Sequence, residues 1–537
     1  MIRISRAVRE KHFGVALATA CLVGLPGLAF AETADPAAGT APTLAQQIDG
    51  VFSRLVDSMA GVLFYDFGTG VPLIVLWLIA GAIFFTLRMR FVNVRAFRHA
   101  IDVVRGKYDD PKDKGEVTHF QALTSALSGT VGLGNIAGVT IAVSTGGPGA
   151  VFWMLVAGFF GMSSKFVECT LGQMYRRVRP DGRVSGGPME YLDRGLADLG
   201  MPRVGKTLGI LFALLCIGGC LGGGNMFQAN QSFSLISATV ADRTGADLSG
   251  YSWAYGLVLA LLVAIVIVGG IKRIGRATSK IVPLMCGIYL AASIFVIATH
   301  AAEVPALLAR IVTDAFSGQA VAGGMLGAIV VGVKRAVFSN EAGIGSAAIA
   351  HAAAKTDEPV REGLVALLGP FVDTIVICLM TALVVLITGV WENPALEGVE
   401  GAALTSRAFE SVIGWFPYVL SAAVFLFAYS TMISWSYYGE RCWEHVFGRR
   451  STPVFKGLFL ACVLLGAVAN LGSVLVFTDM MILCMAFPNI AGVVILSGKV
   501  RSALDDYWRR YRGGEMRAFD ESPEGDSISL GIEPAVS

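Results

Sequence analysis

Two interrupted apolar stretches decide the fold of this chain. The first reads Ser-Gly-Thr-Val-Gly-Leu-Gly-Asn-Ile-Ala-Gly (128–138), and the second reads Phe-Ser-Asn-Glu-Ala-Gly-Ile-Gly-Ser (338–346). Each places glycine and polar residues inside a run that is otherwise long and apolar enough to cross a bilayer. Irregular backbone at membrane depth is tolerated only where it is buried in protein or lines a water-filled cavity. Both stretches are therefore predicted to unwind at a binding site.

The composition places most of the chain in a membrane. Of the 537 residues, 54% are hydrophobic and only 15% are charged, whereas soluble domains contain about 25% charged residues. The 42 Lys and Arg nearly balance the 40 Asp and Glu, which argues against a nucleic-acid partner. The 64 glycines suit closely packed membrane helices. We predict an all-α polytopic membrane protein.

The N-terminus has the pattern of a cleaved signal peptide over residues 1–31. Basic residues precede an apolar run at 14–30, and Ala29-Phe30-Ala31 gives the small-x-small pattern of a cleavage site. The alternative is an uncleaved first helix. In both cases the following segment begins outside the cytoplasm.

Apolar runs of about twenty residues predict 11 transmembrane helices. They cover 71–87, 119–146, 148–175, 207–236, 252–271, 280–299, 321–350, 362–390, 405–437, 455–471 and 475–497. Alternate connections carry 31 Lys and Arg on one side of the membrane, against four on the other. Because basic loops stay in the cytoplasm, we expect the N-terminus outside and the C-terminus inside, in the cell (inner) membrane.

The two interrupted stretches lie in the second and seventh spans, so each opens a set of five. An odd number of spans inverts the second set relative to the first, and paired broken helices in inverted halves indicate a secondary transporter's binding site. The predicted division is a signal peptide (1–31), a periplasmic segment with an extra helix and a cytoplasmic loop (32–118), two repeats (119–300 and 321–500) and a cytoplasmic tail (501–537).

The chemistry of a broken helix suits a zwitterion and a cation. Free amide groups favour a carboxylate, and free carbonyls suit Na⁺ or an ammonium group. Glu341 is the strongest single candidate for a functional residue, since an ionisable side chain inside a membrane span is costly and usually has a function. Its alternative is a charge pair with Lys334 or Arg335 that locks the helix. For Asp373 and Asp479, which lack a glycine-rich setting, we predict structural pairing.

Polar residues in two further spans have two interpretations. Gln228 and its neighbouring amides follow a triple glycine, and they bind either a ligand or adjacent helices. Ser430 and Thr431 either ligate a cation or bond back to their own helix. Trp435 either restricts a pocket to small side chains or packs. For either interrupted stretch alone, the glycines also fit helix packing.

Taken together, these motifs resemble the alanine or glycine:cation symporters, also called sodium:alanine symporters. The resemblance covers residues from about 60 to 500 and rests on Gly-Leu-Gly-Asn-Ile-Ala-Gly-Val (132–139), Gly-Gly-Pro-Gly-Ala (146–150), Gly-Gly-Pro-Met (186–189), the stretch 338–346 and Ala-His-Ala (350–352). It implies a leucine-transporter-like fold of two inverted five-helix repeats, preceded by one extra helix. It also implies Na⁺-coupled import of alanine or glycine without an organic cofactor.

The resemblance further implies the residues of the site. Substrate contacts would fall on Thr130, Gly134, Gln228, Phe338, Ser339, Asn340 and Glu341, and Na⁺ ligands on Gly132, Ser430 and Thr431. The expected partners are a small neutral amino acid and the lipid bilayer, with no nucleic acid, and the expected state is a monomer. The alternatives are an ion channel, for which no filter pattern is visible, and a membrane-embedded enzyme, for which no intramembrane catalytic constellation is visible.

Overall fold

The computed structural model describes residues 44–317, 324–396, 398–399, 401–468, 472–516 and 518. The predicted signal peptide and most of the predicted tail lie outside these residues. Helices dominate the described chain, and a short antiparallel hairpin joins β1 (Arg177–Val178) to β2 (Val184–Ser185).

Helical segments of membrane-crossing length recur along the described chain. Eight are long and apolar enough: Gly134–Met174, Pro202–Thr244, Ser249–Ile267, Gly270–Thr299, Pro359–Thr388, Phe416–Phe447, Arg449–Val468 and Val476–Arg512. Exposed residues on these helices include Leu261 (58% exposed) and Ile265 (62% exposed). Such an apolar exterior is unfavourable in water but is covered in a bilayer. The chain is a helical membrane protein, and the count of 11 spans stays a prediction.

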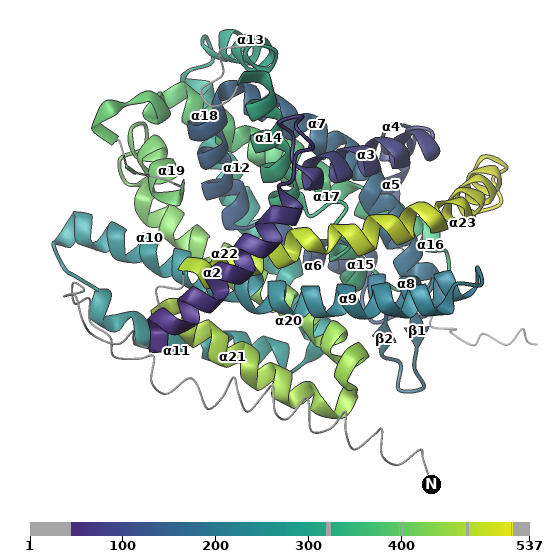
Figure 1. Cartoon of the computed structure of the whole chain (residues 1–537). Coiled ribbons are helices and arrows are strands. Elements are labelled where there is room, and N and C mark those ends of the chain that lie inside the picture. The colour runs from purple at the N-terminus through teal and green to yellow at the C-terminus, as the bar shows by residue number, and fades with distance from the viewer. Residues whose placement is uncertain are drawn as a thin grey trace, which may run out of the picture.

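In the described chain, four helices precede the first broken helix. They are α2 (Leu44–Leu63), α3 (Leu73–Arg88), α4 (Val92–Arg95) and α5 (Phe97–Val104). The sequence did not predict α2 as a helix. It crosses α22 on the near side of the molecule in Figure 1, which brings its C-terminal end close to the cavity described below.

The first half of the bundle contains two segments with irregular helical turns. Its elements are α6 (His119–Thr130), η1 (Gly134–Gly138), α7 (Val139–Met174), α8 (Pro188–Ala197), α9 (Pro202–Leu221), η2 (Gly222–Met226), α10 (Phe227–Thr244), η3 (Ser249–Tyr251), α11 (Ser252–Ile267) and α12 (Gly270–Thr299). α7 is kinked at Gly147, where φ is 69° and ψ is −175°. The kink separates two predicted spans, because Pro148 cannot continue the preceding helical hydrogen bonds.

The second half of the bundle shows that one predicted span is two helices. Its elements are α13 (Val304–Ala315), α14 (Gly324–Asn340), α15 (Ala347–His351), α16 (Pro359–Ala366), α17 (Leu368–Pro370), η4 (Phe371–Cys378), α18 (Leu379–Thr388), η5 (Val390–Glu392), η6 (Pro394–Leu396), α19 (Gly401–Glu410), α20 (Phe416–Phe447), η7 (Arg449–Ser451), α21 (Thr452–Val468), α22 (Gly472–Cys484) and α23 (Ala486–Arg512). The predicted run 405–437 was wrong at its start: α19 ends at Glu410, and α20 begins with Pro417 in its first turn, a favourable place for proline.

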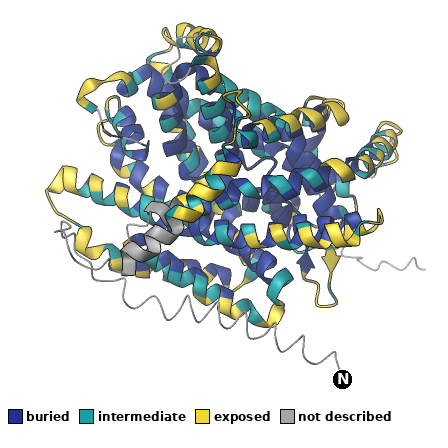
Figure 2. Ribbon diagram, in the orientation of Figure 1, coloured by how far each residue is buried: buried dark blue, intermediate teal, exposed yellow. Residues whose placement is uncertain are grey.

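Both predicted helix breaks are confirmed. α6 ends at Thr130 and η1 begins at Gly134, while α14 ends at Asn340 and α15 begins at Ala347. The second break contains left-handed backbone at Glu341, Gly343 and Gly345, with φ of 55°, 88° and 92°. The centre of the molecule around these breaks is buried, whereas exposed residues gather on outer elements such as α10 and α13 (Figure 2). Irregular backbone therefore lies inside protein, as membrane depth requires.

Candidate functional site

The two broken helices line a cavity of about 290 Å³, near the lower end of the size range of small-molecule sites. Its walls come from α6 and η1, from η2 and α10, from α14, from α20 and from α22. Seven of the predicted site residues lie on these walls: Thr130, Gly132, Gly134, Gln228, Phe338, Glu341 and Thr431. The structure thus brings together residues up to about 300 positions apart in the chain.

Two predicted substrate contacts lie behind the cavity wall instead. Ser339 Oγ donates to Asp373 Oδ2 at 2.7 Å and accepts from Asn135 Nδ2 at 2.8 Å. Asn340 Nδ2 donates to Thr374 Oγ1 at 2.9 Å. These bonds join η1, α14 and η4, so both residues brace the break. Asp373 takes the structural role that the sequence indicated.

The two predicted hydroxyl ligands of Na⁺ differ in their placement. Ser430 Oγ donates to the Phe427 carbonyl of its own helix at 3.0 Å, and Ser430 lies outside the cavity lining. Thr431 lines the cavity, and its Oγ1 donates to the Ser128 carbonyl at 3.0 Å. Ser128 Oγ in turn donates to the Ser430 carbonyl at 2.6 Å. α20 is therefore fastened to the end of α6 directly beside the first break.

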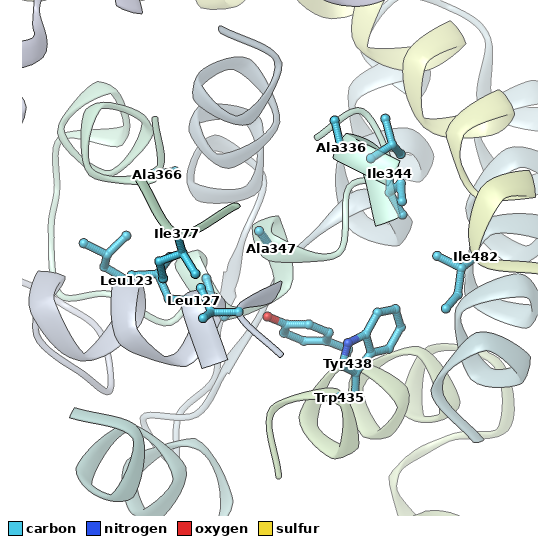
Figure 3. Packing of buried hydrophobic residues seen from close by; sticks show 14 of the residues in the cluster. Leu123, Leu127, Ala336, Ile344, Ala347, Ala366, Ile377, Trp435, Tyr438 and Ile482 are labelled. Atoms are coloured by element: carbon cyan, nitrogen blue, oxygen red, sulfur yellow. The ribbon is translucent and has the colours of Figure 1, made fainter. Parts of the chain in front are cut away.

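Close backbone approach at two glycines brings α20 against both irregular turns. A Cβ atom on Gly132 would lie 2.8 Å from Thr431 Oγ1, and one on Gly224 would lie 2.4 Å from Trp435 Cγ. Trp435 Nε1 also donates to the Gly129 carbonyl at 3.2 Å. In Figure 3, Trp435 and Tyr438 project from α20 beside the break, with Ile482 of α22 on the other side. These rings limit the space beside the break.

Gln228 presents a hydrogen-bond acceptor at the cavity. Its Nε2 donates to the Gly223 carbonyl at 3.1 Å. Its Oε1 is buried, and the described residues offer it no hydrogen-bond partner. A buried polar atom without a partner is unfavourable, so this oxygen is suited to an N–H donor or a cation supplied by a ligand.

Glu341 is buried at the second break, with 3% of its surface exposed. Its Oε2 accepts a hydrogen bond from Ser346 Oγ, which closes the loop between α14 and α15. The described residues show no ion pair between Glu341 and Lys334 or Arg335, so the predicted alternative of a locking pair is not what the structure contains. Lys165 of α7 supplies the positive charge that acts on this carboxylate.

Sequence reasoning named three charged residues without predicting that they line this cavity. Lys334, Arg335 and Asp479 line it, together with Phe64 from the end of α2. The positions 334, 335, 338 and 341 share one face of a helix, and this spacing was the signal that could have found the two cations. For Asp479 structural pairing was predicted, but the described residues show no ion pair at its carboxylate, and its place on the cavity depends on how α22 packs.

Sequence reasoning also missed Asn489, whose side chain supports the second break. Asn489 Nδ2 donates to Glu168 Oε1 at 2.7 Å and to the Gly343 carbonyl at 2.9 Å. Its Oδ1 accepts from the Tyr191 hydroxyl. Together these three hydrogen bonds hold the unwound loop to α7, α8 and α23. These four residues are dispersed along the chain, and nothing in their local sequence marks them as neighbours.

Membrane-length helices with two breaks that meet at one cavity define a secondary transporter. The sequence matches the sodium:alanine symporter family over residues 52–521, and the chain belongs to that family.

Similar proteins agree with this placement. The sodium/alanine symporter AgcS of Methanococcus maripaludis is 41% identical over 451 residues, covering 84% of this chain and 94% of that protein. The probable sodium/glutamine symporter GlnT of Bacillus subtilis is 34% identical over 452 residues, covering 83% and 90%. The crystal structure of MhsT in complex with L-phenylalanine aligns with a TM-score of 0.51 at 14% identity, covering 71% of this chain and 89% of that one.

The fold and the family together establish the class of activity. The likeness to MhsT shows a leucine-transporter-like fold. The family and its relatives are transporters and not enzymes. The chain is therefore a multi-pass membrane protein and a cation-coupled amino-acid symporter.

Proposed function

We propose that this protein imports alanine or glycine together with Na⁺ by alternating access. The observation that carries the proposal is the convergence of both broken helices on a cavity near the size of a small ligand, together with Gln228 Oε1, which has no hydrogen-bond partner among the described residues. The substrate carboxylate meets amide groups freed at the breaks, and its ammonium group meets Gln228 and Glu341. The sodium/alanine symporter AgcS supports alanine as the substrate.

The cavity walls support a small side chain on the substrate. Trp435 is held by its bond to the Gly129 carbonyl and lies against Gly224. Phe338 lines the cavity from α14. A larger substrate would have to displace one of these rings, and a packed aromatic side chain moves only at the cost of its contacts. Thr130 and Gly134 complete the proposed substrate contacts.

For Na⁺ we propose a place between the first break and α20. Thr431 Oγ1 and the backbone at Gly132 lie together there, and oxygen atoms are the ligands that hard cations prefer. Ser430 joins this set when its hydroxyl turns away from the Phe427 carbonyl. Ser339 and Asn340 act through the position of the break, because their side chains are occupied by Asp373 and Thr374.

We also propose the 11-span topology with two inverted repeats of five, acting as a monomer in the inner membrane after removal of residues 1–31. The packing supports it, since elements of the first half contact their counterparts in the second: η1 contacts α14, α7 contacts α16, α9 contacts α20 and α11 contacts α21. Elements related by a nearby two-fold axis are expected to meet in this way.

The test is counterflow of labelled alanine in proteoliposomes that contain the purified protein. Exchange should require Na⁺, and unlabelled glycine should compete while glutamine and phenylalanine should not. Exchange that persists when choline replaces Na⁺ would refute the coupling. Exchange of glutamine but not of alanine would refute the substrate assignment, and the absence of exchange for all four would refute both.

A matched pair of variants tests whether Gln228 binds alanine in the cavity. Gln228→Leu removes the free acceptor and should reduce alanine affinity at least tenfold, because the substrate loses a buried hydrogen bond. Gln231→Leu is the control, since Gln231 bonds to Asn230 in the same helix and does not line the cavity. Equal affinities in the two variants would contradict the proposed role of Gln228.

A further inference from the structure

One buried face of α7 follows the second break along its length. Four residues at intervals of four, three and four positions share this face: Gly161, Lys165, Glu168 and Gly172. A Cβ on Gly161 would lie 2.8 Å from Ala342 Cβ, and one on Gly172 would lie 2.9 Å from the Ala348 carbonyl oxygen. Lys165 and Glu168 therefore lie between two places where α7 touches the segment that follows Glu341.

Lys165 is a buried cation without a partner in direct contact. The residue is 3% exposed, and the described part of the chain shows neither an ion pair nor a hydrogen bond at its ammonium group. Its charge nevertheless acts on the carboxylates of Glu168, Glu341 and Asp373. Asp373 already accepts hydrogen bonds from three neighbouring side chains. Because a buried charge is unfavourable without a countercharge, Lys165 is suited to pair with Glu168 or Glu341.

Glu168 offers a second acid on the same helix as the lysine. Its Oε1 accepts from Asn489 Nδ2 at 2.7 Å, and the same amide also donates to the Gly343 carbonyl of the break. Its Oε2 is buried and has no hydrogen-bond partner among the described residues. Lys165 precedes Glu168 by three residues, or about 4.5 Å along the helix axis, and its long, flexible stem can turn toward either acid.

We propose that Lys165 is the counter-ion of Glu341 in the cargo-free protein and turns to Glu168 when the substrate's ammonium group takes its place. The proposal rests on the proposed function, in which the ammonium group meets Glu341, and adds a positioning residue for the return step. Lys165 contacts no cargo itself. It determines whether the carboxylate of Glu341 is balanced before the amino acid arrives.

This role acts on one half of the transport cycle. Net uptake requires the protein to return without cargo, whereas exchange requires only that the loaded protein change its orientation. A buried carboxylate without a countercharge is strongly unfavourable, so the cargo-free protein needs the ammonium group of Lys165. The loaded protein has the ammonium group of the amino acid instead. Loss of Lys165 should therefore separate net uptake from exchange.

The first experiment compares these two activities in proteoliposomes containing the full-length protein. Lys165→Met removes the charge and keeps an unbranched side chain. Net alanine uptake driven by a Na⁺ gradient should fall at least tenfold, while counterflow of labelled alanine should stay within threefold of wild type. Lys107→Met is the matched control, because Lys107 is exposed and lies outside the buried core. A parallel loss of both activities would show a merely structural lysine and would overturn the proposal.

The second experiment uses the acid to which the lysine turns. Glu168→Gln keeps an acceptor for Asn489 but removes the charge, so Lys165 stays on Glu341 and competes with the amino acid. Alanine affinity at saturating Na⁺ should fall about tenfold. Adding Lys165→Met removes the competitor and should restore the affinity to within threefold of wild type, an interaction between neighbouring sites that a double-mutant cycle measures.

The outcomes distinguish this proposal from the proposed function. If wild type shows neither binding nor counterflow of alanine in Na⁺, both fail. If wild type transports alanine and Lys165→Met keeps both activities, only the role of Lys165 is wrong. A double variant that binds alanine as weakly as Glu168→Gln would also overturn it, because no competition would then have been relieved. The number of binding sites at saturation reports the folded fraction of each variant.

Discussion

Glu341 combines burial, charge and an unusual backbone in a single residue. Its side chain is bonded to Ser346, and its neighbour Gly343 is bonded through its carbonyl to Asn489. The loop between the two helix halves is therefore fixed at both of its turns. Because Lys165 does not neutralise it through an ion pair among the described residues, the carboxylate is available to balance a cation that enters the cavity.

The first prediction concerns Glu341→Gln. Glutamine has nearly the same size and still accepts a bond from Ser346, but it carries no charge. We expect the Na⁺ affinity in the presence of alanine to fall at least tenfold, or by about 1.4 kcal/mol or more, because the alanine ammonium group loses its countercharge and the two ligands bind together. Na⁺ titration of alanine binding measures the effect, with Glu303→Gln at the start of α13 as control. Wild-type Na⁺ affinity would show that the carboxylate is structural.

Individual residues show what the sequence could not decide. Glu341 was identifiable because an acid in an apolar span is expensive. Ser339 and Asn340 follow Phe338 directly, yet their side chains point to η4 rather than to the cavity. The end of a helix redirects successive side chains, so a motif indicates which residues approach the site but not which ones face it.

At the scale of elements, buried hydrogen bonds join the two broken helices at the end away from α2. Glu362 of α16 accepts bonds from His119 Nδ1 of α6 and from His351 Nδ1 of α15, the latter at 2.5 Å. A backbone bridge accompanies them, with Lys355 N donating to the Val117 carbonyl at 2.8 Å. We call this group the histidine latch. It joins α6, α15 and α16 on the side that the basic loops are predicted to place in the cytoplasm.

The second prediction follows from the latch. Glu362→Gln replaces an acceptor of two imidazole bonds with a side chain that accepts on one atom only, so one buried histidine loses its partner. Hydrogen exchange of the amides at 114–119 and 350–356 should accelerate about tenfold. Glu358→Gln is the control, since its ion pair with Arg510 lies outside the latch. Unchanged exchange in Glu362→Gln would contradict the latch.

The third prediction concerns the contact between α5 and α23. His99 Nε2 bonds to the Tyr507 hydroxyl at 2.7 Å, and the Tyr511 ring centre lies 4.0 Å from that of His99. Burial lowers the pKa of His99 from 6.5 to about 4. Between these values the unfolded chain binds the proton and the folded chain does not, so stability falls as the pH falls from 6.5 toward 4.

The melting temperature should therefore fall more steeply over this pH range in wild type than in His99→Phe, which cannot bind the proton. Thermal unfolding in detergent at several pH values measures the difference. His300→Phe, at the end of α12, should keep the wild-type slope. Equal slopes in wild type and His99→Phe would show that other groups govern the acid sensitivity.

Elements differed in how well the sequence predicted them. Both breaks followed from glycine and polar residues in apolar runs, where irregular backbone has few allowed places. The π-helical turn at η2 was not predicted, although the triple glycine marked it, because glycine serves helix packing equally well. α2 was missed because a helix on the surface of the bundle needs no membrane-length apolar run.

For the whole molecule, the distribution of charge predicts its orientation. Native thiols interfere little with a test, since seven of the eight cysteines in the described residues are buried and Cys484 is half-buried. We expect Ser249→Cys to react with a membrane-impermeant maleimide on intact cells, and Arg449→Cys to react only after permeabilisation. Both positions are exposed. Reversed labelling would invert the orientation, and labelling of both on intact cells would refute the alternation of spans.

The left-handed backbone at Glu341 places the stability of the folded protein in conflict with transport. For a residue with a Cβ atom this conformation costs about 1–2 kcal/mol, and a glycine there would remove that strain together with a buried charge. Selection for heat resistance alone should therefore favour Glu341→Gly. The resulting protein would unfold at a higher temperature but would lack the charge that balances the substrate's ammonium group. Glu341 thus combines a strained backbone with a buried charge at the proposed site, as is typical where function and stability compete.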